Sequence, residues 1–314
     1  MSAPSSPQQS LVVAAGEPPL RLDVYLVKHA DISRTKLQEK IKDGSITLNG
    51  KSAKAHHLVR PGDEIIVHDR ETVVHAEAKV IDTLAPTILA EDEAFLVVNK
   101  PAGLLVHGGP GIHERTLADW AVAHDAAIAQ VGDQPDVRPG IVHRLDREVS
   151  GVIVIAKSAD AFRHLKRQFQ DHTIFKSYIA LAYGRITDQA GRIDFAIARK
   201  PDKSGLMVAR PKSTEGKDAE TLFHVERFVK NMTLVRIQTL TGRTHQIRVH
   251  FKAIGHPLIG DSLYRVKRMK VEKLPPPRLF LHAQVLEFDD LGNKRRHYEA
   301  PLPADLAQFL AKAG

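Results

Sequence analysis

The chain is predicted to fold as an α+β protein, with a mixed, largely antiparallel central sheet flanked by helices and a small N-terminal α+β unit. Two observations predict this class. Runs of branched and aromatic residues typical of strands are interspersed with amphipathic helical patterns, but the two do not alternate as strictly as a parallel α/β sheet requires. A stretch of scattered charge over residues 71–87 also reads as a linker between a basic N-terminal part and a larger domain at residues 88–314.

Composition narrows the possible partners and chemistries. The 314 residues include 45 Lys and Arg against 37 Asp and Glu, a net charge of +8, which favours a polyanionic partner where the charge clusters. The absence of cysteine excludes disulfides, thiolate zinc sites and a cysteine nucleophile. No run approaches the roughly 18 apolar residues of a membrane span, and no signal peptide is recognisable. We therefore expect a cytoplasmic protein with a disordered tail over residues 1–18.

Residues 19–70 predict a small basic unit. The run RLDVYLVKHA has apolar residues at helical spacing, and RTKLQEKIKD over residues 34–43 predicts a second helix. The run SITLNGKSAK then alternates around Asn49-Gly50, which is a strong hairpin signal, and RPGDEIIVH adds a turn and a strand. The basic residues of the second helix are Arg34, Lys36, Lys40 and Lys42. They predict either a solvated helix face or a surface for nucleic acid.

Five runs in the larger domain predict strands, because branched or aromatic residues dominate them: AFLVVNK, GVIVIAK, KSYIALAYG, MTLVRIQTL and LFLHAQVLEF. Three amphipathic patterns predict helices: TLADWAVAHDAAIAQ, SADAFRHLKRQFQ and THQIRVHFKAIG. The Pro275-Pro276-Pro277 run predicts a loop. No G-x-G-x-x-G opens a helix after a strand, so a nucleotide cofactor is not expected.

The stretch VHRLDREVSG, residues 142–151, places the carboxylate of Asp146 between Arg144 and Arg147. The apolar run VIVIA follows directly, so Asp146 is expected on a loop at the mouth of a rigid sheet, where functional sites are commonly built. Nearby guanidinium groups favour an ionised carboxylate, and an ionised carboxylate can act as a nucleophile. A surface ion cluster is the alternative interpretation.

A second basic constellation lies in TGRTHQIRVH, residues 241–250, which contains Arg243, His245 and Arg248 but no acid. Arg243 is expected just before a helix start, where backbone N–H groups also favour an anion, so the place suits a phosphate or a catalytic carboxylate. Zinc is a poor interpretation, because His245 and His250 are five residues apart and no Glu follows His245. A hydrogen-bonded structural histidine is the simpler interpretation of His245.

The run KSYIALAYG places Lys176 and Tyr178 on one face of a strand and Ile179 and Leu181 on the other. Tyr178 is then either a core tyrosine or a platform on which a nucleic-acid base stacks. Basic runs such as RHLKR, RVKRMK and KRR show that the positive charge is clustered. RNA is therefore the leading partner.

These motifs together resemble those of the RluA family of pseudouridine synthases. HRLDREVSGVIVIAK resembles the catalytic motif of that family, KSYIALAYG its tyrosine strand, and TGRTHQIRVHFKAIGHPLIGD its arginine motif. NKPAGLLVH matches as well, and the N-terminal unit with ITLNGK and VRPGDEIIV resembles the S-four RNA-binding domain. The resemblance spans Pro19 to Pro303. It implies an isomerase that detaches uracil from its ribose in RNA and rejoins it through carbon 5, with no cofactor or metal.

The resemblance also implies roles for single residues. Asp146 would attack the ribose or the base, or remove a ribose proton; Arg243 would pair with Asp146 and keep it ionised. Tyr178 would stack on the base and assist proton removal from carbon 5. Arg144 would help to fill the gap left by the flipped nucleotide. The other residues expected to contact RNA are Arg34, Lys36, Lys40 and Arg248.

Large-subunit ribosomal RNA is the implied target, and base flipping is expected because the glycosidic bond of a stacked uridine is out of reach. Val149 stands where the family usually has threonine, so a hydroxyl contact there is missing. Two other interpretations are a catalytically silent RNA-binding assembly factor and a metal-dependent nuclease. The presence of Asp146 argues against the first, and the lack of a second acid near the arginine motif argues against the second. We expect a monomer.

Overall fold

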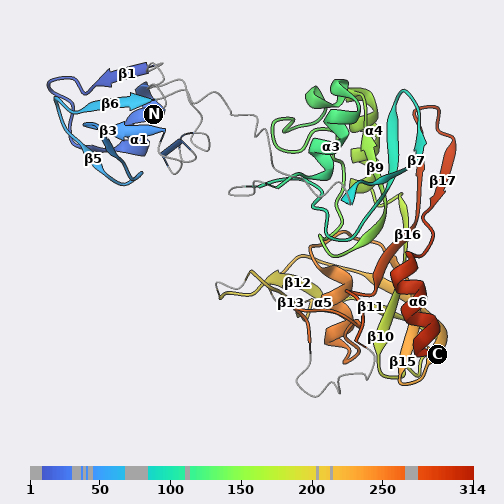
Figure 1. The fold of residues 1–314 in the computed structure, drawn as a ribbon. Helices are drawn as coiled ribbons and strands as arrows, with labels where there is room; N and C mark the ends of the chain where they lie inside the picture. Colours follow the sequence, from blue (N-terminus) through green and yellow to red (C-terminus); the bar gives the residue numbers. More distant parts are fainter. Residues whose placement is uncertain are drawn as a thin grey trace. The chain divides into compact units, whose positions relative to one another are not determined.

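A computed structural model of the chain describes residues 9–29, 37, 40–41, 45–67, 84–109, 114–202, 205–212, 215–265 and 275–314. The chain forms two compact units, Met1–Val80 and Ile81–Gly314, which are drawn in Figure 1. Both units combine helices with sheets, so the predicted α+β class is confirmed.

The described residues of the N-terminal unit form two small sheets and helix α1 (Leu22–His29). The larger sheet has the order β1 (Gln9–Val12), β6 (Glu64–Val67), β3 (Ile46–Leu48) and β4 (Lys51–Ser52), and the smaller one pairs β2 (Leu20–Arg21) with β5 (Leu58–Val59). The predicted hairpin is confirmed, because Asn49 and Gly50 both have positive φ, as its two-residue turn requires.

The N-terminal tail and the predicted second helix differ from expectation or are described only in part. The disordered tail over residues 1–18 is wrong in part, because Gln9–Val12 pair antiparallel with β6 and the next residue, Val13, is buried in the core of the unit. Of the predicted second helix, only Leu37, Lys40 and Ile41 are described, and they are helical. Leu37 and Ile41 are buried in the same core, as their i, i+4 spacing predicts. The predicted RNA-binding residues Arg34 and Lys36 lie outside the described residues.

Nine strands of the described larger unit form one sheet (Figure 1). Across the sheet they are β11 (Ala190–Ile193), β14 (Thr221–Val229), β15 (Met232–Thr239), β10 (Phe175–Tyr183), β16 (Leu281–Asp289), β9 (Ser150–Ala156), β8 (Phe95–Lys100) and β7 (Thr87–Glu91), with β17 (Arg295–Glu299) also paired to β16. Only β9 and β16 run parallel among the described pairs. The predicted mixed, largely antiparallel sheet is confirmed.

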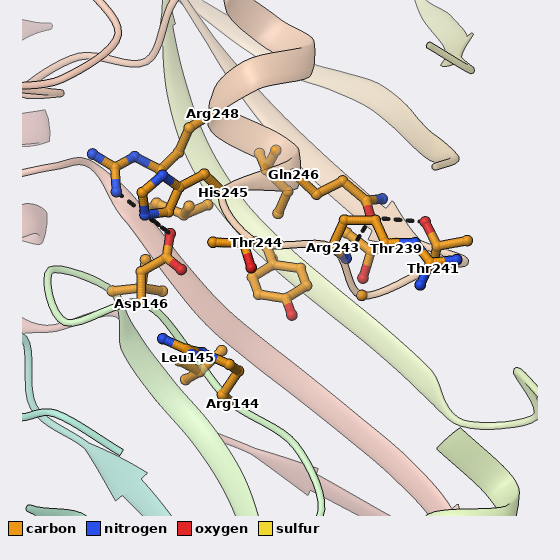
Figure 2. A pocket seen from close by; sticks show the side chains of 15 residues that line it. Arg144, Leu145, Asp146, Thr239, Thr241, Arg243, Thr244, His245, Gln246 and Arg248 are labelled. Atoms are coloured by element: carbon orange, nitrogen blue, oxygen red, sulfur yellow. Dashed lines mark hydrogen bonds and ion pairs between the residues drawn. The ribbon is translucent and has the colours of Figure 1, made fainter. Parts of the chain in front are cut away.

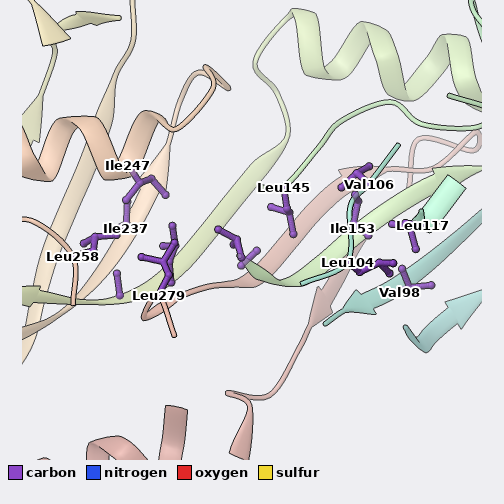
Figure 3. Close-up of a cluster of buried hydrophobic side chains, with 14 of the residues drawn as sticks. Val98, Leu104, Val106, Leu117, Leu145, Ile153, Ile237, Ile247, Leu258 and Leu279 are labelled. Carbon is purple, nitrogen blue, oxygen red and sulfur yellow. The ribbon is translucent and has the colours of Figure 1, made fainter. Parts of the chain in front are cut away.

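Alternation along β9 divides the core of the larger unit between the two faces of the sheet. Ile153 and Ile155 enter a cluster that also takes in α3 (Leu117–His124) and α5 (Gln246–Ala253), shown in part in Figure 3. Val152 and Val154 enter a second cluster with α4 (Ala159–Gln170). Burial of both faces explains why GVIVIAK is apolar without alternation.

The predicted helices are present with small changes. Helix α4 begins behind Ser158, whose side chain accepts a hydrogen bond from the N–H of Ala161 at 3.2 Å, as an N-cap does. The pattern at residues 116–130 is interrupted, because Asp125 is extended, so a 3₁₀ helix at Ala126–Gln130 follows α3. The elements of this unit that were not predicted include α6 (Ala304–Ala313), the hairpin of β12 (Ala196–Arg199) and β13 (Met207–Arg210), and the strands β7, β11, β14 and β17 of the main sheet.

Gly151 allows the parallel pairing of β9 with β16. Its φ is 129°, and a Cβ atom there would lie 2.1 Å from the carbonyl oxygen of Ala283 on β16. Only glycine permits so close an approach of two backbones. Because Gly151 ends the VHRLDREVSG stretch, this junction fixes where the loop carrying Asp146 enters the sheet.

Candidate active site

A pocket opens between the loop before β9, the strand β10 and the start of α5 (Figure 2). Each of the three sequence motifs lines it: Arg144 and Asp146 from the first, Tyr178 from the second, and Arg243 and Arg248 from the third. The structure therefore brings together all the predicted site residues of the larger unit.

Lys100 holds the loop that carries Asp146 through hydrogen bonds to backbone carbonyls. This lysine is fully buried at the end of β8, and its Nζ donates hydrogen bonds to the carbonyls of Leu104 (2.8 Å), Pro101 (2.9 Å) and Arg147 (3.3 Å). The N–H of Gly103 donates to the Arg147 carbonyl as well, at 2.7 Å. Burial lowers the pKa of Lys100 to about 7. The sequence offered one signal for this role, a lysine that ends an apolar strand directly before proline.

The far end of the loop is held by a buried polar network. Ser150 Oγ lies 2.9 Å from His282 Nδ1, and His282 Nε2 lies 3.1 Å from the carbonyl oxygen of Ala300. Since a carbonyl only accepts, Nε2 carries the proton and Nδ1 accepts from the Ser150 hydroxyl. Arg278 donates to the same hydroxyl oxygen at 3.1 Å. Burial lowers the pKa of His282, which keeps the imidazole neutral.

Asp146 pairs with Arg248, and the expected pairing with Arg243 is wrong. Nη1 of Arg248 lies 3.4 Å from Oδ2 of Asp146, whereas Nε of Arg243 donates to the backbone carbonyl of Asp218 at 2.9 Å. Figure 2 shows Asp146 and Arg248 together at one end of the pocket and Arg243 at the other. Because α5 begins at Gln246, Arg248 is in its first turn while Arg243 stays on the preceding loop.

A buried carboxylate orients Arg248. Asp261 accepts two hydrogen bonds from the guanidinium, from Nε at 2.8 Å and from Nη2 at 2.9 Å, and both side chains are 1% exposed. Burial alone would raise the pKa of Asp261, but Arg248 outweighs it and holds that pKa below its ordinary value. This fork leaves Nη1 free to face Asp146. Sequence reasoning missed Asp261, although it ends the quoted stretch TGRTHQIRVHFKAIGHPLIGD.

Neither arginine beside Asp146 in the sequence pairs with it, so that expectation is also wrong. Arg147 forms a bidentate pair with Glu114, in which Nη1 and Oε2 are 2.9 Å apart. Arg144 is exposed at the pocket and has no ion pair or hydrogen bond within the described ranges. It is therefore available to a ligand.

His245 lies beside Arg248, and both face the same oxygen of Asp146 (Figure 2). It lies directly before α5 with φ of 55°, and its Nδ1 is 2.7 Å from the hydroxyl of Tyr264. Its Nε2 is 3.9 Å from Oδ2 of Asp146. Burial lowers the pKa of His245, although Asp146 acts in the opposite direction. The prediction that His245 is hydrogen-bonded is confirmed.

Tyr178 lies on the wall of the pocket, and its ring packs against the core cluster of α3 and α5. The predicted division of faces is confirmed, because Ile179 and Leu181 lie in a different cluster with α6. Burial raises the pKa of Tyr178 to about 12, a hydrogen bond with Thr239 lowers it, and the charge of Asp146 raises it further. The phenol is therefore protonated at neutral pH.

Val149, which stands in place of the family's usual threonine, is 2% exposed and packs in the same core cluster as Leu145 and Ile153. An apolar side chain fits these surroundings.

A second hollow, lined by the β12–β13 hairpin, shares the segment 242–244 with the pocket. The charged residues that line this hollow are three cations, Arg199, Lys217 and Arg243, and one acid, Glu215.

In the part of the chain that the structure describes, no group of three His, Cys, Asp or Glu side chains could hold a metal ion. The same part contains no helix that is long and apolar enough to cross a membrane.

Comparison with known proteins places this site in a class. Residues 94–253 match the family of RNA pseudouridylate synthases, and residues 20–65 match the S4 domain. Fold, site and matches define an RNA-modifying isomerase with an attached RNA-binding domain. The chain belongs to the RNA pseudouridylate synthase family, as the RluA-type motifs predicted, and it is an RNA pseudouridine synthase.

Relatives and solved structures agree with this assignment. The chain is 38% identical to the uncharacterized RNA pseudouridine synthase YlyB of Bacillus subtilis, over 92% of this chain and 93% of the relative. It is 35% identical to ribosomal large subunit pseudouridine synthase D of Vibrio vulnificus, over 92% and 89%. Human RNA pseudouridylate synthase domain containing 1 superposes with a TM-score of 0.57 at 25% identity, covering 70% of this chain and 84% of the human chain.

Proposed function

We propose that this protein isomerises uridines of large-subunit ribosomal RNA to pseudouridine, using Asp146 on a base flipped into the pocket. The names of the relatives from Vibrio vulnificus and Salmonella typhi support the choice of RNA, since both are ribosomal large subunit pseudouridine synthases. The predicted division of the chain into an N-terminal S4-like domain and a larger isomerase domain fits this role. Cytoplasmic location and a monomeric state remain predictions.

The observation that carries the mechanism is the ion pair of Asp146 with Arg248 beside Tyr178. Arg248 is oriented by Asp261 so that its guanidinium faces Asp146 without covering it, and the Asp146 side chain remains 15% exposed at the pocket. Such a fixed carboxylate can attack the ribose or the base, or remove a ribose proton. In each case the N1–C1′ bond breaks and a C5–C1′ bond forms, while carbon 5 gives up a proton to solvent and N1 takes one up, so that the overall change is an isomerisation.

Tyr178 and Arg144 complete the proposed site. The ring of Tyr178 forms a wall on which uracil can stack. Because its phenol is protonated at neutral pH, Tyr178 is better suited to positioning the uracil than to accepting a proton as a general base. Arg144 is exposed and unpaired among the described residues, so it can fill the place that the target base leaves in the RNA. Flipping costs a few kcal/mol, and phosphate contacts offset that cost.

Arg243 takes a different role from the one that the motif implied. It lies on the loop between the pocket and the hollow with Arg199 and Lys217. Because its guanidinium forms no ion pair within the described residues, we assign it to the phosphates of the RNA strand that leaves the pocket. Arg248, in contrast, is too buried to contact RNA.

The proposal is tested by tritium release from ribosomal RNA labelled at carbon 5 of uridine. Wild type is expected to release tritium and Asp146→Asn to release none. Glu148→Gln is the matched control, because Glu148 also faces Nη1 of Arg248, at 3.5 Å, but is 41% exposed; it should retain most activity. A wild-type protein that binds the RNA but releases nothing would favour the silent assembly factor, and an active Asp146→Asn variant would remove Asp146 from the mechanism.

A further inference from the structure

Lys176 is a cation at the rim of the pocket that the mechanism above does not use. It lies two residues before Tyr178 on β10. Its Nζ is 4.0 Å from the place where a Cβ atom on Gly242 would be, and Gly242 lines the pocket. On its other side Nζ lies 5.9 Å from the centre of the Phe169 ring on α4.

Oxygen atoms match the two fully buried cations of this unit and the half-buried Lys157, whereas Lys176, which is also half-buried, has no such partner among the described residues. Lys100 donates to three carbonyls, and Arg248 is held by Asp261. Lys157 lies 2.7 Å from Glu91 and 3.2 Å from Asp125. Within the described ranges, Lys176 has neither an ion pair nor a hydrogen bond, and its ammonium group lies over the Phe169 ring instead.

An ammonium group in this position is costly for the free protein. Burial alone lowers the pKa of Lys176 to about 8, with no carboxylate acting against it. A methionine would fill the same space beside Phe169 without this cost. The charge is therefore better explained by a ligand that is absent from the free protein and carries the opposite charge.

We propose that Lys176 binds a backbone phosphate of the RNA next to the target uridine and holds the strand at the pocket mouth during flipping. The inference rests on the proposed function, since RNA is the polyanion that the activity supplies. A lysine suits a phosphate as a compact charge with three donors. Together with Arg144 and Arg243, Lys176 would surround the mouth with three cations, none of which has an ion pair among the described residues.

Salt dependence of binding tests the proposal directly. The affinity of RNA is measured from low to high salt in the Asp146→Asn background, where turnover does not interfere. Lys176→Met is expected to reduce the slope of log K against log salt by about 0.7 to 0.9, the value for one lost phosphate contact, which weakens binding about fivefold near 0.1 M salt. Lys176→Arg should keep the slope. Lys157→Met is the control, because Glu91 and Asp125 already match its charge.

The pH profile gives a second readout that simple packing would not move. Among the described groups around Lys176, His143 is neutral because burial lowers its pKa to about 3, and Phe169 and Gly242 do not ionise. Lysine binds phosphate when protonated, so wild-type kcat/KM should fall as pH rises through about 8 to the lower level of Lys176→Met. Lys176→Arg stays charged and should lack this fall.

Two failures can be told apart. If wild type is active but Lys176→Met changes neither the salt slope nor the pH profile, Lys176 only packs on Phe169 and the inference is overturned. If wild type makes no pseudouridine, the proposed function fails, and the binding measurements still decide whether Lys176 contacts RNA. Should Lys176→Met fail to fold, as judged by circular dichroism, Lys176→Gln replaces it in the same comparison.

Discussion

Substitution of Asp261 by asparagine isolates the residue that orients Arg248 without touching the substrate. Both side chains of the pair are 1% exposed, and they are joined by two hydrogen bonds from Arg248 to the Asp261 carboxylate. The substitution replaces that carboxylate by a neutral amide. Leaving one buried charge without its partner costs about 3–5 kcal/mol. Asparagine keeps one acceptor, and Asp146 stays 3.4 Å from Nη1, so we expect the lower end of this range, about 3 kcal/mol.

This loss should be visible in urea and thermal unfolding. For a unit of this size, about 3 kcal/mol corresponds to a Tm lower by roughly 6–12 °C. Arg248 holds the pKa of Asp261 below its ordinary value. The pair therefore stabilises the protein fully at pH values above the ordinary pKa of an aspartate. The stabilisation is lost as pH falls through the lowered pKa. The difference between wild type and variant should therefore be largest near neutral pH and shrink in acid.

Activity should fall with stability, because a mobile Arg248 no longer fixes Asp146. A displacement of about 1 Å in such a site costs on the order of 100-fold in kcat, and KM should change little. Glu148→Gln is again the control, with an effect of at most about 1 kcal/mol on stability, since Glu148 is 41% exposed and lies 3.5 Å from Arg248. An Asp261→Asn protein with wild-type stability and kcat would refute the proposed role of the buried pair.

Two further predictions concern the N-terminal unit and the junction of the sheet. Deletion of residues 1–70 should leave the larger unit folded but weaken RNA binding and reduce its salt dependence. The reason is that nine Lys and Arg, against four Asp and Glu, lie between Arg21 and Arg60. Unchanged affinity would contradict an RNA-binding role for the S4 domain. Gly151→Ala should cost roughly 2–5 kcal/mol, because its Cβ would meet the Ala283 carbonyl at positive φ, whereas Gly108→Ala, with nothing within 4 Å, should be tolerated in the same urea titration.

Much of the site was predictable because its motifs are local. The loop of Asp146 precedes an apolar strand that is buried on both faces, and the alternation of KSYIALAYG places Tyr178 toward the pocket and Ile179 away from it. These features need only the period of a strand. The class of the sheet likewise followed from the order of strand and helix patterns.

The errors have a common cause in contacts between segments far apart in sequence. The spacing of TGRTHQIRVH permits either arginine to face Asp146, and the exact start of α5 decides for Arg248. The partner of Arg147 is Glu114, 33 positions away, and no pattern announces it. Strand β1 was taken for tail because its pairing with β6, more than fifty residues later, cannot be inferred from four residues of ordinary composition.

The most direct test of the account compares Arg248→Met with Arg243→Met in the tritium-release assay. The structure places Arg248 on Asp146 and Arg243 on the loop toward the second hollow. We therefore predict that Arg248→Met loses kcat by at least about 100-fold, while Arg243→Met mainly raises KM and lowers the salt dependence of binding. The reverse result, with kcat lost on removal of Arg243 and retained without Arg248, would contradict the assignment of the Asp146–Arg248 pair as the reacting centre.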